Sequence, residues 1–379
     1  MRRNLRILHV GTRFIPIGHQ HGGALQRRIL ALARRQASNG HEVTVASAAG
    51  VPRSIRNEPF ETVEIEANLG GLSSHFEFLL RLKRRLRGRN YDVMHAHGQP
   101  HAASVLGKSA DKTVHSVDFF EYRGSALGPI RYLYSRSLAR YDMHLAASVF
   151  TAQTLCEYYP SLAETVSVFP NGVDPDHFRS SNVDRQACRR KFNLGELPVV
   201  LYVGRVSEQK GSDLLGTLAM QLRDRGVAVN VVAAGPFDRF GNQKPNKLVR
   251  LLRNQGVAIL GPVSEVDLVA LMAVADVAVL PTRRFEMFGM AALEALASGT
   301  PVVASNLGGI PEAVGPGGLL FEPGNGDEFA RGVMQLLLDP DLAQLLVQRS
   351  RQHIQALSWN GLSEDLIKLY ETEMFSSRK

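Results

Sequence analysis

Short apolar runs recur along the chain, and most are followed by a loop and then by a segment with helical spacing. These runs lack the strict alternation of a half-exposed strand, which is typical of strands buried on both faces of a parallel sheet. Strand, loop and helix in repeated succession predict an α/β fold. The predicted strands are 5–10, 42–46, 91–96, 144–147, 166–168, 199–205, 227–235, 257–263, 277–280 and 301–304, and a further strand ends near Thr113-Val114.

The turn-rich stretch PNGVDP, residues 170–175, interrupts this succession, and a fresh series of strands begins after it. We therefore predict two doubly wound, Rossmann-like domains that face each other across a cleft. They would span residues 1–175 and 176–358, followed by a C-terminal segment 359–379. A chain of 379 residues is long enough for each domain to bury its own core.

Composition fits this architecture and predicts a cytoplasmic location. Hydrophobic residues make up 44% of the chain and charged residues 21%, as in soluble globular proteins. The longest apolar runs are too short to span a membrane, and no small-residue cleavage site follows the basic start at Met1. Cys156 and Cys188 are the only cysteines, which suits a reducing compartment without structural disulfides.

The net charge of +8 lies wholly in the N-terminal half. Residues 1–180 hold 23 Lys and Arg against 15 Asp and Glu, whereas residues 181–379 hold 21 of each. This excess could favour anionic lipid, nucleic acid or a phosphorylated acceptor, or simply keep the surface soluble. The segment 76–89 combines an apolar stripe with six cations, so it would lie on an anionic membrane surface or pack as an ordinary solvated helix. The cations are Arg81, Lys83, Arg84, Arg85, Arg87 and Arg89.

Two acids in the segment LPTRRFEMFGMAALEALASGTPVVAS, residues 280–305, have a spacing that limits their chemistry. On one helix Glu286 and Glu294 would differ by about 12 Å in rise, whereas the carboxyl groups of a retaining glycosidase lie about 5 Å apart. With Glu286 in a loop and Glu294 in a helix predicted over Met290–Ala297 and closed by Ser298-Gly299, the amides of Phe288 and Gly289 near the helix N-terminus would suit phosphate. That layout fits a nucleotide diphosphate sugar. A capping acid and a surface acid are the alternative.

Two glycine-bearing loops are further candidates for phosphate binding. Arg205 and Lys210 follow a predicted strand in GRVSEQKG, where Arg offers forked hydrogen bonds and Lys a point charge. Gly22 and Gly23 stand between the first strand and a helix, where exposed amides can meet phosphate or sugar oxygens. Exposed loop charges and a simple turn are the alternatives. A nicotinamide dehydrogenase is disfavoured, because GTRFIPIG lacks the G-x-G-x-x-G spacing.

Four histidines raise the question of a metal site: His95, His97, His101 and His115. His95 and His97 alternate on one predicted strand, and no acidic or cysteine partner stands at ligand spacing, so no metal site is predicted. His115 stands near a predicted strand end, where open parallel sheets place functional side chains. A buried, hydrogen-bonded histidine is the alternative.

Together these motifs carry a family resemblance. LYVGRVSEQKG followed by FEMFGMAALEALASGTPVVASNLGGIPEAV resembles the donor half of retaining glycosyltransferases of family 4, which have the GT-B fold. VHSVD, PNGVD and the segment after Trp359 extend the resemblance over nearly the whole chain. It implies a retaining hexosyltransferase without obligatory metal or other cofactor, and a final helix that crosses back to the N-terminal domain.

The resemblance also implies substrates. A hexose would pass from a nucleotide diphosphate sugar to the hydroxyl of a lipid-linked, saccharide or small-molecule acceptor, in glycan, glycolipid, capsule or exopolysaccharide synthesis. Many family members are peripheral membrane enzymes, so an anionic inner membrane surface is a further expected partner. A nucleotide-sugar epimerase or hydrolase on the same fold is the rival enzyme. A basic nucleic-acid-binding protein is disfavoured, because aromatic interleaving and a recognition motif are missing.

For the donor nucleotide, the resemblance implies that Arg205 and Lys210 bind the diphosphate and that Glu294 holds the ribose hydroxyls. Phosphate bound to these cations would be stabilised as it departs, which is the main electrostatic demand of glycosyl transfer. Transfer would then occur on the front face, with the leaving phosphate helping to deprotonate the acceptor.

For the transferred sugar, the resemblance implies contacts from Glu286 and from the amides of Phe288 and Gly289. His115 of the N-terminal domain would line the same sugar site. Gly23, from the Gly22-Gly23 pair, would approach the diphosphate. His115 and Glu286 are thus the implied catalytic residues.

Overall fold

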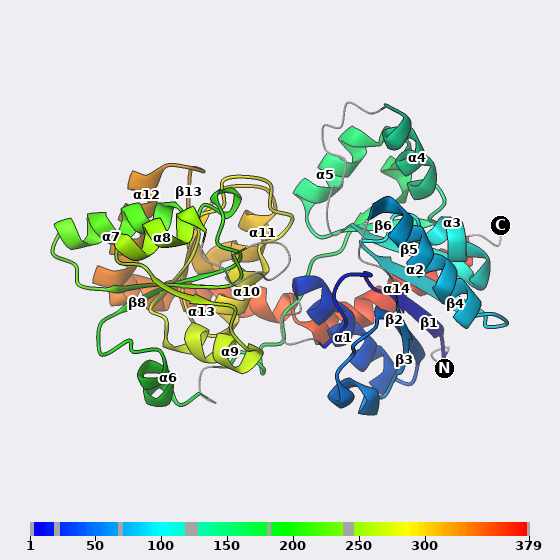
Figure 1. Ribbon diagram of the computed structural model, residues 1–379, viewed down its shortest axis with the longest axis horizontal. Helices are drawn as coiled ribbons and strands as arrows, with labels where there is room; N and C mark the ends of the chain where they lie inside the picture. The colour runs from blue at the N-terminus through cyan, green and yellow to red at the C-terminus, as the bar shows by residue number, and fades with distance from the viewer. Residues whose placement is uncertain are drawn as a thin grey trace. The chain divides into compact units, whose positions relative to one another are not determined.

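The computed structural model describes residues 4–18, 23–66, 71–117, 128–179, 183–237 and 246–376. The chain divides into two compact units (Figure 1). Unit 1 comprises Met1–Asn171 together with Trp359–Lys379, and unit 2 comprises Gly172–Ser358. Each unit holds one parallel sheet with helices packed on it, so the predicted architecture of two doubly wound, Rossmann-like domains is confirmed.

The seven-stranded sheet of unit 1 has the order β3-β2-β1-β4-β5-β6-β7. The chain begins at β1, builds strands toward one edge, and then restarts on the other side of β1 with β4. Such a reversal is a topological switch point, where open α/β sheets bind ligands at the carboxyl ends of the strands. The strands are β1 (Arg6–Val10), β2 (Glu42–Ala48), β3 (Glu61–Ile65), β4 (Tyr91–His97), β5 (Ala110–Val117), β6 (Met143–Ala146) and β7 (Val166–Val168).

Both faces of this sheet are apolar, which explains the unbroken hydrophobic runs in the sequence. Ile7 of β1 lies in the core that includes helices α1 and α14, whereas Leu8 lies in the core that includes α2 and α3. Leu366 and Tyr370 of α14 are buried in the first of these cores, so the C-terminal helix is part of unit 1. The helices of unit 1 are α1 (Ala24–Ser38), α2 (Gly71–Arg85), α3 (Ala102–Leu106), α4 (Gly128–Leu138), α5 (Val149–Tyr158) and α14 (Trp359–Ser376).

Unit 2 repeats the plan with six strands in the order β10-β9-β8-β11-β12-β13, and its switch point lies between β8 and β11. Its strands are β8 (Val199–Val203), β9 (Asn230–Ala234), β10 (Ala258–Gly261), β11 (Val277–Leu280), β12 (Val302–Ser305) and β13 (Gly318–Phe321). Its helices are α6 (Arg185–Lys191), α7 (Leu214–Asp224), α8 (Lys247–Asn254), α9 (Glu265–Val274), α10 (Met290–Ala297), α11 (Ile310–Val314), α12 (Gly326–Leu338) and α13 (Pro340–Ala356). Among the helices described, none is both long and apolar enough to cross a membrane.

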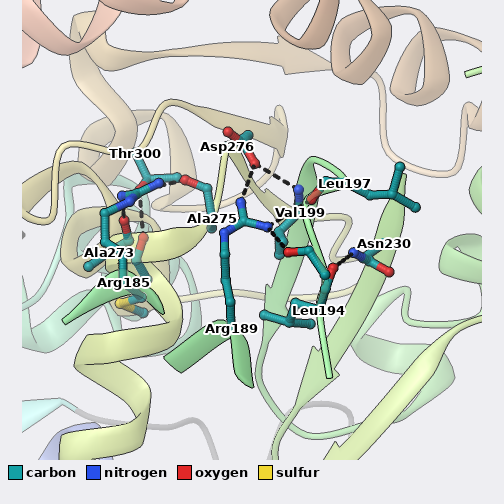
Figure 2. A network of polar contacts seen from close by, with 12 residues as sticks. Arg185, Arg189, Leu194, Leu197, Val199, Asn230, Ala273, Ala275, Asp276 and Thr300 are labelled. Carbon is teal, nitrogen blue, oxygen red and sulfur yellow. Dashed lines mark hydrogen bonds and ion pairs between the residues drawn. The ribbon is translucent and has the colours of Figure 1, made fainter. Parts of the chain in front are cut away.

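The amino edge of the unit 2 sheet is tied together by polar side chains (Figure 2). Asp276, just before β11, accepts a 2.7 Å hydrogen bond from the Val199 amide, and its own amide donates to the Val199 carbonyl group at 2.9 Å. Arg189 of α6 lies 3.8 Å from the same carboxylate and donates to the carbonyl groups of Gly195 and Leu197. The starts of β8 and β11 are thereby fixed against each other.

Aspartates also connect adjacent strands at the amino edge of the unit 1 sheet. Asp92, at the second position of β4, accepts a 2.7 Å hydrogen bond from the Arg6 amide of β1. Asp142, just before β6, accepts a 2.7 Å bond from the Thr113 amide of β5. An aspartate near the start of one strand therefore aligns the adjacent strand, and functional groups at the opposite, carboxyl edge gain a fixed framework.

We predict that Asp276→Ala destabilises unit 2 by about 1–3 kcal/mol, because the Val199 amide is left without its acceptor inside the protein. Urea unfolding would measure the loss. Glu196→Ala is a suitable control, since Glu196 is exposed in the loop between Gly195 and Leu197 and should change stability by less than about 0.5 kcal/mol. Equal stabilities of the two variants would contradict the role of Asp276.

Candidate active site

The pairing of β8 with β11 brings two loops together at the carboxyl edge of the unit 2 sheet. Gly211 ends the loop after β8 with φ of +67°, and a Cβ atom there would lie 1.6 Å from the Pro281 carbonyl oxygen. The amides of Arg283 and Arg284, in the loop after β11, donate to the Gln209 carbonyl group at 3.2 and 3.3 Å. The two loops are therefore in direct backbone contact.

The loop after β8 is held in one shape by internal hydrogen bonds. The Tyr202 hydroxyl donates to the Arg205 carbonyl group at 2.6 Å, and the Lys210 amide donates to the Ser207 carbonyl group at 3.0 Å. Arg205 is half-buried, and its Nε is buried without a hydrogen-bond partner among the described residues. Its Nε–H is thus available to an acceptor from outside the loop.

Lys210 and Glu286, predicted separately from two motifs, form an ion pair between the two loops. Their side chains retain 29% and 19% exposure, so the pair is shielded from water only in part. The backbone of Glu286 is also fixed, because its carbonyl oxygen accepts a 3.0 Å hydrogen bond from Gly309. Gly308 permits this approach, since a Cβ atom there would lie 2.2 Å from the Glu286 carbonyl oxygen.

Helix α10 starts at the edge of the same site. Gly289 is its N-cap residue with φ of +101°, a left-handed conformation that disfavours other residues, and Phe288 before it is buried. The helix spans Met290–Ala297, the range predicted from the sequence. The Ala292 amide of the first turn bonds to the Gly289 carbonyl oxygen at 3.0 Å, and Gly289 offers no side chain to cap the amides before it. The positive end of the helix therefore faces this edge of the site, where an anion is stabilised.

Glu294 lies inside α10 and is 2% exposed. The negative charge of Glu294 acts on the imidazole group of His177. The Nε2 atom of His177 lies 3.2 Å from a carboxylate oxygen of Glu265. The hydrogen bond with Glu265 raises the pKa of His177, and the charges of Glu265, Asp174 and Glu294 raise it further, against the opposing effect of burial. Glu294 therefore lies in an acidic part of unit 2 that also holds a histidine, a feature that the sequence motifs did not indicate.

The remaining predicted residues belong to unit 1. His115 is 3% exposed and lies two positions before the end of β5, with its Nδ1 3.3 Å from Nδ1 of His144. Burial lowers the pKa of His115 well below its usual range, so the ring is neutral. Gly23 is the N-cap residue of α1, and its amide donates to Gln26 Oε1 at 3.0 Å. Gly22 lies outside the described residues.

A third histidine, His9, joins two of those considered as metal ligands. One nitrogen from each of His9, His95 and His97 lies within 4.8 Å of the others. The pairing of His9 with His95 on adjacent strands creates this cluster, and the spacing along the chain did not reveal it.

Hydrogen bonds already use most of the ring nitrogens in this cluster. His9 Nδ1 lies 2.9 Å from His97 Nε2, and His9 Nε2 lies 2.7 Å from Gln36 Oε1. His95 bonds to the Tyr370 hydroxyl of α14 at 2.6 Å and to Ser116 Oγ, also at 2.6 Å. Burial lowers the pKa of His9 to about 4. We interpret the cluster as a neutral, hydrogen-bonded part of the core that attaches α1 and α14 to the sheet.

Comparison with known proteins identifies the family of this chain. Residues 22–177 match the model of Glycosyltransferase Family 4, and residues 184–353 match Glycosyl transferases group 1. A D-inositol 3-phosphate glycosyltransferase of Actinosynnema mirum is 31% identical over 84% of this chain and 81% of its own length. The chain belongs to glycosyltransferase family 4. It is therefore a retaining glycosyltransferase, which transfers a sugar from a nucleotide sugar to an acceptor, as the resemblance implied.

Further relatives of this glycosyltransferase agree. A D-inositol 3-phosphate glycosyltransferase of Saccharomonospora viridis is 30% identical over 91% of this chain and 85% of its own length. A glycosyltransferase structure from Rickettsia africae has a TM-score of 0.80 at 20% identity, covering 99% of this chain and 100% of that one. Anabaena HepE, solved with UDP and glucose, has a TM-score of 0.76 at 20% identity, covering 97% and 100%. The predicted GT-B fold is thus confirmed.

We predict that Gly211→Ala destabilises unit 2 of the glycosyltransferase more than Gly226→Ala does. Both glycines have positive φ, which costs an alanine about 1–2 kcal/mol. Only at Gly211 would the new Cβ also meet the Pro281 carbonyl group, whereas at Gly226 no atom of the described residues lies within 4 Å of it. Urea unfolding of the two variants isolates the contact between the loops, and equal losses would contradict it.

Proposed function

We propose that the carboxyl edge of unit 2 binds the nucleotide diphosphate sugar. Arg205 and Lys210 would bind the diphosphate, and Glu294 would hold the ribose hydroxyls. Glu286 and the Phe288 and Gly289 amides would contact the sugar. The ion pair between Lys210 and Glu286 is the observation that carries this proposal, because it joins the predicted phosphate ligand to the predicted sugar ligand.

The ion pair also suggests how the donor would fit. The two ends of the pair complement the two ends of a sugar diphosphate, since an ammonium group attracts phosphate and a carboxylate accepts hydrogen bonds from sugar hydroxyls. Each partner would then exchange part of its contact with the other for a contact with the donor. As the glycosidic bond breaks, Lys210 would neutralise negative charge that develops on the leaving diphosphate.

The chemistry that we propose is front-face transfer without a metal ion. The leaving phosphate would help to deprotonate the acceptor hydroxyl, so that configuration at the anomeric carbon is retained. His115 and Gly23 of unit 1 would contribute contacts to the sugar and the diphosphate. Because His115 is neutral, its ring could donate or accept a hydrogen bond without adding charge.

For the acceptor, we propose a phosphorylated polyol as the first compound to assay. The relatives from Actinosynnema mirum and Saccharomonospora viridis are named D-inositol 3-phosphate glycosyltransferases. The positive charge excess of residues 1–180 favours an acceptor with a phosphate group. A lipid-linked or saccharide acceptor is the alternative, and the basic helix α2 favours the lipid-linked one.

We expect Lys210→Ala and Glu294→Gln to weaken donor binding by about ten- to hundredfold each, since each removes hydrogen bonds to or from a charged group. Isothermal titration calorimetry with UDP-, GDP- and ADP-sugars would first identify the donor and then measure the loss. Arg253→Ala, which removes an exposed cation from α8, should leave the affinity unchanged. Unaltered binding by the first two variants would overturn the site.

We also propose that α2 attaches the enzyme peripherally to an anionic membrane surface on the cytoplasmic side. Phe76 and Leu80 of α2 are 42% and 49% exposed, one helical turn apart. Of the six cations that follow them, four form no ion pair with an acidic side chain of the described residues. These four are Lys83, Arg84, Arg85 and Arg87. Apolar side chains beside unpaired cations are typical of helices that lie in the lipid headgroup region. The free cysteines Cys156 and Cys188 support the cytoplasmic location.

The membrane proposal predicts that the double variant Arg84→Ala/Arg85→Ala binds vesicles of phosphatidylserine and phosphatidylcholine roughly thirtyfold more weakly, at about 1 kcal/mol per cation. Flotation or sedimentation of the vesicles measures binding. Arg349→Ala/Arg351→Ala removes the same charge from two exposed positions of α13 and should leave vesicle binding unchanged. If both double variants lose binding equally, net charge rather than α2 is responsible.

A further inference from the structure

Ser207 lies in the middle of the loop after β8, and its hydroxyl group has no evident structural task. The Oγ atom is buried without a hydrogen-bond partner among the described residues. Ser207 has an extended backbone, with φ of −156° and ψ of 154°, and precedes the short turn Glu208–Lys210. A serine at such a position ordinarily caps the turn with its hydroxyl, but here no cap bond forms.

The backbone of Ser207, by contrast, is strongly held. Its carbonyl oxygen accepts hydrogen bonds from the Lys210 amide at 3.0 Å, from the Ser212 amide at 3.3 Å and from the Ser212 hydroxyl at 2.9 Å. The loop therefore keeps its shape without the Ser207 hydroxyl. The same bonds fix the backbone from which that hydroxyl projects, so a partner that the described residues do not supply could bind it without reordering the loop.

Arg205, two residues earlier, has a matching deficit. Its Nε is also buried without a partner among the residues that the structure describes. An arginine Nε–H can only donate, and a serine hydroxyl can donate as well, so one ligand with several acceptor oxygens satisfies both. Both groups lie on the loop that carries Lys210, at the switch point between β8 and β11. A phosphoryl group meets these requirements and is also attracted by Lys210.

We propose that Ser207 is a further ligand of the donor diphosphate, and that its hydroxyl donates to a phosphoryl oxygen between Arg205 and Lys210. This inference rests on the proposed donor site and adds a residue to it. The hydrogen bond strengthens as negative charge accumulates on the departing nucleoside diphosphate, because charge-assisted hydrogen bonds are the stronger ones. Ser207 therefore contributes to leaving-group stabilisation as well as to binding.

The test compares Ser207→Ala with Ser363→Ala by isothermal titration calorimetry and thermal unfolding. Ser363 of α14 is a matched control, since its hydroxyl is also buried without a partner in the described part of the chain. Removing an unsatisfied hydroxyl should leave both variants as stable as the wild type or more so. The four probes are UDP, GDP, ADP and inorganic pyrophosphate. The nucleoside of whichever nucleoside diphosphate binds most tightly serves as a control without phosphate.

We expect Ser207→Ala to bind pyrophosphate and the nucleoside diphosphate about tenfold more weakly, which corresponds to about 1.4 kcal/mol, with nucleoside binding unchanged. Ser207→Thr should restore most of the affinity, and Ser363→Ala should bind like the wild type. If the wild type binds a nucleoside diphosphate but Ser207→Ala binds it equally well, the inference is wrong while the donor site stands. If Ser207→Ala unfolds at a clearly lower temperature, the hydroxyl is structural and the inference is also wrong. If the wild type binds none of the four probes, the proposed donor site itself fails.

Discussion

The parallel pairing of β8 with β11 is the contact on which the candidate active site depends. These strands are far apart in the sequence, but their adjacency places the loop with Lys210 against the loop with Glu286. Asp276 fixes the two strands at their amino edge, and the close approach of Gly211 to Pro281 fixes the loops at the carboxyl edge. Anchoring at both edges holds the charged groups in place before a substrate arrives, which is the preorganisation that electrostatic stabilisation requires.

Much of the fold could be predicted from the sequence, because most strands are buried on both faces and therefore appear as continuous apolar runs. The α10 segment was predicted to the residue because strong helix formers end at Gly299 after a loop with Gly289. Two strands were missed. β3 alternates polar and apolar residues at the sheet edge and contains two glutamates. β13 is a short run that itself starts with Gly318, directly after Gly315 and Gly317.

The sequence predicted which residues belong to the candidate site, but not which of them contact each other. Residue types in GRVSEQKG and FEMFGMAALEALA indicated phosphate and sugar ligands, yet the Lys210–Glu286 pair follows from strand order, which no local pattern contains. His9 was missed for the same reason, since only the register of β1 against β4 brings it to His95. His115 was expected near a strand end, with a buried, hydrogen-bonded histidine as the alternative, and the structure places it near the end of β5, buried beside His144. Its part in catalysis thus remains a proposal drawn from the family resemblance.

Amide hydrogen exchange of the whole protein, with and without UDP, GDP or ADP, tests most directly whether this site holds the donor. We predict that the nucleotide that binds slows exchange in two segments, residues 205–212 after β8 and 286–294 around the start of α10. The first segment would bond to the diphosphate and the second to the ribose through Glu294, so their protection should rise together with nucleotide concentration. Protection confined to other parts of unit 2, with these two segments unchanged under saturating nucleotide, would contradict the account.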